Sequence, residues 1–184
     1  MYYRHLKGVL TSADCQSIIL RGKTQGFETA LVNQGDGTQA LMTRVRNNER
    51  VLFDDPALAL ALQDKLQAGG DFPFAFKDLA FQATGTLFRI YKYTPGQYFK
   101  PHKDGAVESG GCKSEITVLF YLNDADGGDT VLMPQGRAQE ASFIRISPKA
   151  GDVLMFEHRF WHEGQPVRSG EKYVLRTDLF YAPA

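Results

Sequence analysis

The chain has 184 residues, of which 43% are hydrophobic and 23% charged, and its 21 basic and 21 acidic residues give a formal net charge of zero. This length suits one domain with a hydrophobic core and leaves little room for two. Nucleic-acid-binding proteins usually carry a basic excess, so the balanced charge argues weakly against that class.

No apolar run approaches the roughly 20 residues that cross a bilayer, and the first residues lack the apolar core of a secretory signal. Cys15 and Cys112 are the two cysteines of the chain, whereas a disulfide scaffold would use more. We therefore expect a cytoplasmic protein that does not contact a membrane.

Two helices are predicted in the first half of the chain. Thr11 followed by Asp14 is a capping pattern, and the apolar residues after it share one face up to Gly22. The second helix begins at Pro56 after a capping aspartate, and leucines recur at every fourth position before Gly69 ends it.

Between these helices, residues 27–32 are predicted to form a strand. Residues 34–50 then lack periodicity and contain two glycines and three asparagine or aspartate residues, which predicts a long loop. Such loops are functional or disordered, and we expect this one to be a lid over a site.

The second half of the chain predicts an antiparallel β-structure. Its apolar segments are rich in branched and aromatic residues and are separated by Gly, Pro and Asn-Asp pairs: residues 87–93, 115–122, 130–133, 142–146, 152–156 and 172–181. Strands without intervening helices indicate a sandwich or barrel. We therefore expect a mainly β (α+β) fold, a jelly-roll core with supporting N-terminal helices.

Three residues are candidates for a metal site. His102 and Asp104 are two positions apart, so on a strand they project to the same face, and His162 follows 60 residues later. Two imidazoles and one carboxylate leave three coordination positions open, which is typical of non-haem Fe(II) oxygenases. His158 is the rival third ligand, but we favour His162 and expect His158 to lie beside the site.

An oxygenase of this type needs a cation to hold the far end of its co-substrate. Lys172 lies ten residues after His162, at the start of the last predicted strand, and can form a charge-assisted hydrogen bond to a carboxylate. Arg176 shares that face of the strand and is the second candidate, although an ion pair with Asp178 or another acid is an equal alternative.

Five ordered motifs resemble the prolyl 4-hydroxylase-like branch of the 2-oxoglutarate/Fe(II)-dependent dioxygenases, over about residues 87–181. They are YTPGQYFKPHKD at 93–104, TVLFYLN at 117–123, GGDT at 127–130, PKAGD at 148–152 and HEGQPVRSGEK at 162–172. The resemblance implies a double-stranded β-helix core, iron bound by His102, Asp104 and His162, and 2-oxoglutarate bound by Lys172.

The resemblance also implies roles for two tyrosines. Tyr121 matches a family tyrosine that hydrogen-bonds the distal carboxylate. Tyr93 matches the tyrosine that precedes the glycine before the H-x-D pair, and the resemblance implies that it lines the same pocket. Arg176 and Asp178 stand where better-known prolyl hydroxylases carry small polar residues, which leaves the choice between Lys172 and Arg176 open.

The implied reaction is hydroxylation of an aliphatic C–H, with O2 as oxidant and 2-oxoglutarate converted to succinate and CO2. The family adds ascorbate as an optional cofactor and favours a prolyl residue of a protein or peptide as substrate. Residues 1–184 would form one dioxygenase domain, in which residues 1–80 supply support and the lid and residues 87–181 supply the catalytic core.

Three alternatives remain at this point. The same core serves free amino acids and other small molecules, and it also serves alkylated nucleic acids, a class that the zero net charge disfavours. A jelly roll that binds metal without turnover is the third.

Four basic residues precede Asp104 and have two readings: Arg89, Lys92, Lys100 and Lys103. They are either solvated surface residues or the basic mouth of a site that attracts an anionic co-substrate. The oligomeric state is not predicted.

Overall fold

The computed structural model describes residues 2–33, 38–40 and 42–184. Its largest element is a ten-stranded sheet that contains β1 (Tyr3–Leu6), β2 (Glu28–Thr29), β5 (Glu49–Asp54), β6 (Ala75–Phe76), β7 (Leu79–Thr84), β8 (Leu87–Tyr93), β10 (Glu108–Ser109), β11 (Cys112–Tyr121), β15 (Val153–Glu157) and β18 (Lys172–Pro183). A four-stranded sheet contains β9 (Phe99–His102), β13 (Thr130–Met133), β14 (Ile144–Ile146) and β16 (Trp161–Gly164).

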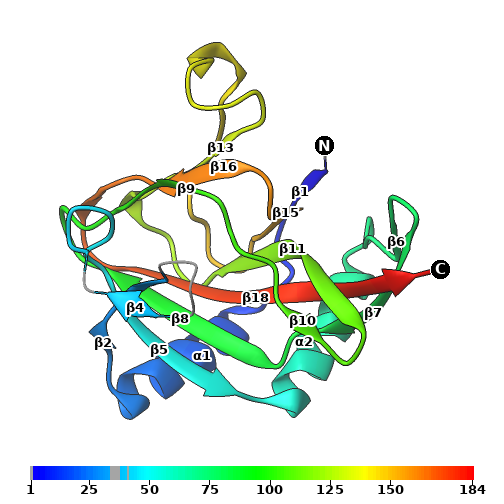
Figure 1. Cartoon of the computed structure of the whole chain (residues 1–184). Coiled ribbons are helices and arrows are strands. Elements are labelled where there is room, and N and C mark those ends of the chain that lie inside the picture. Colours follow the sequence, from blue (N-terminus) through cyan, green and yellow to red (C-terminus); the bar gives the residue numbers. More distant parts are fainter. Residues whose placement is uncertain (1, 34–37, 41) are drawn as a thin grey trace.

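The strand pairs of both sheets are antiparallel among the residues described. Two short ribbons complete the β-structure, β3 (Val32–Asn33) with β4 (Gln39–Ala40), and β12 (Asp126–Gly127) with β17 (Val167–Ser169). In Figure 1 the four-stranded sheet lies over one face of the large sheet, and the two helices lie against the other face. The predicted mainly β fold with N-terminal helices is confirmed.

Both predicted helices are present. In α1 (Ser12–Gln25), Thr11 accepts a hydrogen bond from the Asp14 amide while the Asp14 carboxylate accepts one from the Thr11 amide, so the predicted cap forms. In α2 (Pro56–Ala68), Asp55 caps the first turn through the Leu58 amide. A single turn of 3-10 helix covers Glu140–Ser142.

Strand β18 separates the hydrophobic core from the interior between the sheets. Tyr173, Leu175 and Leu179 belong to a buried cluster that includes residues of α1 and α2. The alternate residues face the other way, so that Lys172 and Arg176 line a cavity between the sheets. The same alternation in β8 buries Ile90 in the cluster that contains residues of the helices and turns Tyr91 and Tyr93 toward that cavity.

The predictions for residues 27–50 need correction. The strand expected over 27–32 is two short strands, β2 and β3, with Ala30 and Leu31 between them. Residues 34–37 and 41 of the predicted lid lie outside the described residues. The lid boundary is wrong at its end, because residues 49–50 begin β5, which pairs with β8 along its whole length. The alternation of buried Val51 and Phe53 with exposed Leu52 indicates this strand.

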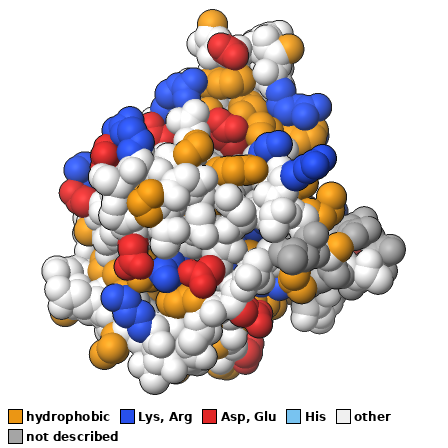
Figure 2. All heavy atoms as spheres, turned by 90° about the vertical axis from the view of Figure 1, so that its left-hand side faces the viewer, with side chains coloured by type: hydrophobic (Ala, Val, Ile, Leu, Met, Phe, Trp, Pro, Cys, Tyr) orange, Lys and Arg blue, Asp and Glu red, His pale blue; other side chains and the backbone are white. Residues whose placement is uncertain are grey.

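The surface carries both signs of charge. Figure 2 shows basic and acidic side chains interspersed on one face. Among the described residues, neither helix is long and apolar enough to cross a membrane.

Candidate active site

The structure brings the three predicted metal ligands together. His102 is the last residue of β9, and the antiparallel register places it directly opposite His162 on β16. Asp104 follows two residues after β9. One ligand atom from each of the three side chains lies within 4.8 Å of the other two.

The two imidazoles are oriented to offer the same ring nitrogen. Nδ1 of His102 lies 2.8 Å from the carbonyl oxygen of Lys100, and Nδ1 of His162 lies 3.1 Å from that of Phe160. Because a carbonyl oxygen can only accept, each Nδ1 carries the proton and donates. In the neutral rings each Nε2 then keeps its lone pair, and these nitrogens lie 4.0 and 3.5 Å from the oxygens of Asp104.

Burial keeps these imidazoles neutral. It lowers the pKa of His102 to about 3, with a further lowering from His162 that Asp104 partly offsets. Burial also lowers the pKa of His162, against the opposing effect of Asp104. A neutral imidazole is the form that binds a metal.

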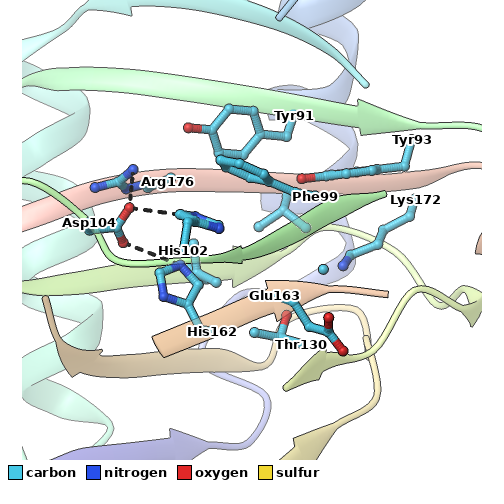
Figure 3. A pocket seen from close by; sticks show the side chains of 13 residues that line it. Tyr91, Tyr93, Phe99, His102, Asp104, Thr130, His162, Glu163, Lys172 and Arg176 are labelled. Atoms are coloured by element: carbon cyan, nitrogen blue, oxygen red, sulfur yellow. Dashed lines mark ion pairs between the residues drawn. The ribbon is translucent and has the colours of Figure 1, made fainter. Parts of the chain in front are cut away.

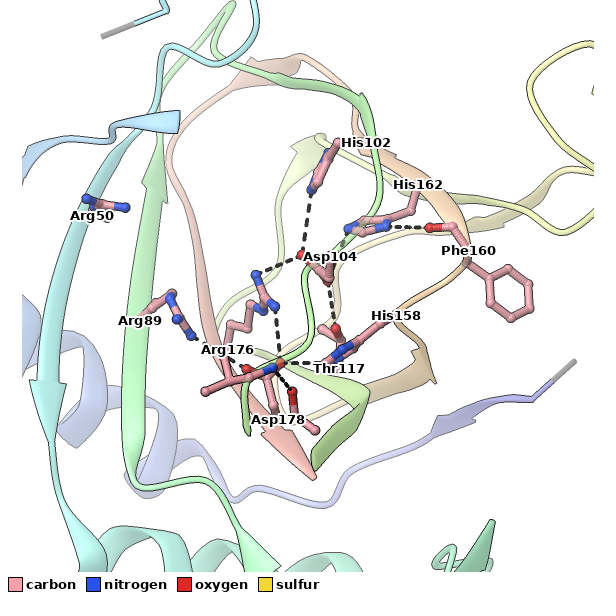
Figure 4. Close-up of polar contacts among 12 residues, drawn as sticks. Arg50, Arg89, His102, Asp104, Thr117, His158, Phe160, His162, Arg176 and Asp178 are labelled. Carbon is pink, nitrogen blue, oxygen red and sulfur yellow. Dashed lines mark hydrogen bonds and ion pairs between the residues drawn. The ribbon is translucent and has the colours of Figure 1, made fainter. Parts of the chain in front are cut away.

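Asp104 is held as a carboxylate by its neighbours. Burial raises its pKa, but the Arg176 cation, helped by a hydrogen bond from Thr117, lowers it well below the usual range. Nη1 of Arg176 lies 2.8 Å from Oδ1, and Thr117 donates a hydrogen bond of 2.6 Å to Oδ2. Figure 4 shows Arg176 between Asp104 and Asp178, whose oxygen lies 3.1 Å from Nη2.

Lys172 lies at the other end of the same cavity. Its Nζ is buried, donates a hydrogen bond to the carbonyl oxygen of Gly128 and lies 5.1 Å from the centre of the Tyr93 ring. Burial lowers the pKa of Lys172 to about 8. In Figure 3, Lys172 and Arg176 come from the same strand but point to different ends of the cavity, with the histidines between them.

The other predicted residues lie at the Lys172 end of the cavity, at its metal-ligand end, or just outside its lining. Tyr93 lines the cavity beside Lys172, and burial raises its pKa to about 12. Tyr121 is fully buried in the core beneath, 5.9 Å from Nζ of Lys172 to its ring centre, and its hydroxyl makes no well-formed hydrogen bond with the described residues. Arg176 lies at the ligand end, in ion pairs with two acids. His158 is buried outside the triad, 3.3 Å from Asp178.

Several cavity residues were missed in the sequence: Tyr91, Phe99, Leu119, Thr130, Glu163, Gly164 and Val174. Tyr91 could have been found, because it lies two positions before Tyr93 on the same strand and shares its face. Phe99 stacks on the His102 ring at 3.5 Å between centres. Phe99 comes from a segment that gave no strand signal, so nothing in the sequence predicted this contact.

The residues present suit Fe(II). Two nitrogen donors and one carboxylate would bind an ion from one side and leave positions open for a co-substrate and O2. The hydrogen bonds from each Nδ1 to a carbonyl are the outer contacts that fix metal-binding imidazoles. The buried cation of Lys172 suits the second carboxylate of a dicarboxylate co-substrate, and the nearby hydroxyl of Tyr121 has no hydrogen-bond partner among the described residues.

Comparisons with known proteins agree with this chemistry. The sequence profile of the 2OG-Fe(II) oxygenase superfamily matches residues 88–177. The chain is 33% identical over 106 residues to "Probable prolyl 4-hydroxylase 11" of Arabidopsis thaliana. That match covers 54% of the chain and 35% of the relative, so the chain spans well under two thirds of the curated relative's length.

Two solved structures share the whole fold. The viral collagen prolyl hydroxylase of Paramecium Bursaria Chlorella virus-1, in its 2OG complex, has a TM-score of 0.65 at 22% identity, covering 98% of this chain and 96% of that one. A prolyl hydroxylase from Trichoplax adhaerens, in complex with a hypoxia inducible factor peptide, has a TM-score of 0.71 at 18% identity, covering 98% and 83%. Residues 88–177 thus match the 2OG-Fe(II) oxygenase superfamily, and within it the chain is similar to the prolyl 4-hydroxylases.

Proposed function

We propose that this protein is an Fe(II)- and 2-oxoglutarate-dependent dioxygenase that hydroxylates an aliphatic C–H. His102, Asp104 and His162 would bind the iron, and Lys172 would hold the distal carboxylate of 2-oxoglutarate. The observation that carries the proposal is one cavity with a buried cation at one end and two Nε2 lone pairs facing a buried carboxylate at the other. Iron and 2-oxoglutarate would supply the oxidation, in which O2 is consumed and succinate, CO2 and the hydroxylated product are released.

The chain's own residues would bind and orient 2-oxoglutarate and would exclude water from the cavity. Lys172 is buried, so its interaction with a carboxylate would be little screened by solvent. Tyr93 and Phe99 would form the apolar walls of the cavity, and Arg176 would keep Asp104 charged and fixed in direction. We assign Lys172, rather than Arg176, as the main contact of 2-oxoglutarate, because both Arg176 amino groups already pair with carboxylates.

By analogy with the prolyl hydroxylases to which the chain is similar, the substrate would be a prolyl residue of a protein or peptide. The alternative substrate is a free amino acid or another small molecule. Ascorbate as a further cofactor and a cytoplasmic location also belong to the proposal. The free thiols Cys15 and Cys112 suit a reducing compartment. We further propose that residues 1–184 form one domain.

An anaerobic titration of the metal-free protein tests the reaction class. Addition of Fe(II) and then 2-oxoglutarate should produce a weak visible charge-transfer band that requires both components. Lys172→Ala should weaken the binding of 2-oxoglutarate by about 10- to 100-fold, because a charge-assisted hydrogen bond is lost. Fe(II) should still bind to this variant.

The controls use residues of the same type. His162→Ala should abolish the band, whereas His158→Ala, which removes a buried histidine outside the triad, should retain it. A band that survives in His162→Ala would remove His162 from the metal ligands. Tight Zn(II) binding with no band at all would argue for a metal-binding module without turnover.

A further inference from the structure

A second cavity adjoins the metal ligands, with a volume of about 290 Å³. It shares Tyr91, Phe99, His102, Asp104 and Arg176 with the first cavity, but Lys172 does not line it. This volume is just below the roughly 300–1,000 Å³ typical of small-molecule sites, which suits a small ligand. We call it the arginine cavity, after its cationic lining residues Arg46, Arg50, Arg89, Lys103 and Arg176.

Positive charge dominates this lining. Asp104 and Asp178 are its two carboxylates, and both are already engaged. Arg176 pairs with each of them, and Asp178 also lies 3.7 Å from Arg89. Figure 4 shows Arg50 and Arg89 on neighbouring strands, facing the side of the site where Arg176 holds the two acids.

Arg46 is a cation of this lining that has no carboxylate partner among the described residues. Its residue is 4% exposed, and no carboxylate of the described residues forms an ion pair with it. Its guanidinium lies 4.1 Å from the ring centre of Phe99 and 4.9 Å from that of Tyr91, and Nε donates to Asn48 at 3.0 Å. Its buried Nη2 has no hydrogen-bond partner among the described residues.

A buried guanidinium without a counter-ion is costly, and buried charges in proteins are normally paired. The aromatic rings recover part of that cost through cation–π contacts but do not satisfy the free N–H groups of Arg46. Arg46 stacks on Phe99, which in turn stacks on the His102 ring, so an anion bound there would lie beside the metal ligands.

2-Oxoglutarate does not account for this unpaired cation. Its distal carboxylate is assigned to Lys172, and its other carboxylate would be held at the metal site together with the keto oxygen. The arginine cavity therefore has capacity for a third carboxylate.

We propose that the arginine cavity binds the carboxylate of a small aliphatic acid, a free amino acid being the simplest case, and so presents a nearby carbon of that acid for hydroxylation. This inference rests on the proposed function and names its substrate class. An internal prolyl residue of a peptide has no carboxylate to offer, whereas free proline does.

The test compares each acid with its uncharged carboxamide. Free amino acids, L-proline first, and the corresponding amides such as L-prolinamide are titrated anaerobically into the protein loaded with Fe(II) and 2-oxoglutarate. Binding is followed by calorimetry and by the change in the charge-transfer band. At least one acid should bind about tenfold or more tightly than its amide, and the same acid should stimulate succinate formation in air.

Variants assign the preference to the cavity. Arg46→Gln should remove most of the difference between acid and amide, Arg46→Lys should retain part of it, and Arg145→Gln, on an exposed position of β14, should leave it intact. Circular dichroism verifies folding, and Arg50→Gln provides a second variant should Arg46→Gln not fold.

Two results would overturn the inference while the proposed function stands. One is a band that forms normally while every acid binds no better than its amide. The other is an Arg46→Gln variant that loses affinity for 2-oxoglutarate instead of the acid, which would make Arg46 a co-substrate contact. Absence of the band in the wild-type protein would overturn the proposed function and this inference together.

Discussion

Arg176 holds two buried carboxylates with one guanidinium. The side chains of Asp104 and Asp178 are 4% and 7% exposed, and both oxygens that face Arg176 lie within 3.1 Å. Removing one partner of a buried ion pair leaves an uncompensated charge, which typically costs about 3 kcal/mol or more. The stability of the metal-free site therefore depends on this residue.

We expect Arg176→Gln to lower the free energy of unfolding of the metal-free protein by about 3 kcal/mol. Mn(II), used as a redox-stable stand-in, should restore part of that loss, because a bound cation would again face Asp104. Urea unfolding with and without Mn(II) measures both effects, and Arg145→Gln serves as the exposed control. An equal loss with and without metal would show that Arg176 does not act through Asp104.

The histidine pair makes the metal-free protein sensitive to acid. Burial lowers the pKa of His102 to about 3 and lowers that of His162, whereas both are about 6.5 in the unfolded chain. Between these values the unfolded state binds more protons than the folded state, so stability falls as the pH falls below about 6.5. Each histidine contributes a slope of up to about 1.4 kcal/mol per pH unit.

Urea unfolding of the metal-free protein at several pH values between 7 and 4.5 should show this slope. In His102→Gln the dependence of the unfolding free energy on pH should decrease by up to about 1.4 kcal/mol per pH unit, the contribution of one histidine, because an amide does not titrate. A slope identical to that of the wild type would mean that His102 is not held neutral by the fold.

One close contact between the N-terminal half and the catalytic half is made at a glycine. Gly151, in the turn before β15, has a φ of +85°, and its carbonyl accepts a hydrogen bond from the Leu10 amide at 3.0 Å. A Cβ at this position would lie 2.3 Å from the carbonyl oxygen of Leu10. No side chain fits there unless the segment that leads into α1 moves.

Gly151→Ala should therefore destabilise the protein by both a strained φ and a clash. The matched control is Gly170→Ala, where φ is +73° but nothing lies within 4 Å of the added Cβ. The left-handed conformation alone costs about 1–2 kcal/mol, so the control should lose about that much and Gly151→Ala clearly more. Equal losses in thermal or urea unfolding would show that the two halves are not tightly fitted at this turn.

Local signals in the sequence predicted elements well where one rule dominated. The capping pair Thr11–Asp14 and Pro56 marked both helices, and branched and aromatic residues bounded by turn residues marked β8 and β18. β9 was missed because Phe99–His102 is short, contains a proline and lies at the edge of the four-stranded sheet. Strands of that kind are recognised by their partners, which a single sequence does not display.

The candidate site was predictable as a set of residue types but not as an arrangement. The motif spacing pointed to His102, Asp104, His162 and Lys172. It did not indicate that Arg176 would turn to Asp104, because that depends on which end of the cavity each residue of β18 reaches. Arg46 was not predicted at all, since its position depends on a segment that resembled a loop.

At the scale of the whole molecule, the two halves share one hydrophobic core. A single buried cluster includes Ile18 of α1, Leu66 of α2, Ile116 of β11 and Leu175 of β18. Both helices lie within the first 68 residues, whereas the one tryptophan, Trp161, lies in the catalytic half. Helical circular dichroism and tryptophan fluorescence therefore report on different halves of the chain.

If residues 1–184 form one domain, these two signals should trace the same urea unfolding curve. Leu66→Ala removes a fully buried side chain of α2 and should lower the free energy of unfolding by about 2–5 kcal/mol. That loss should appear equally in the fluorescence of Trp161, although α2 lies outside the catalytic half. Leu60→Ala, at a position of the same helix that is 63% exposed, should shift neither curve much. If Leu66→Ala moved only the helical signal, the N-terminal residues would be a separate folding unit, and the catalytic core would then not depend on its helical support for stability.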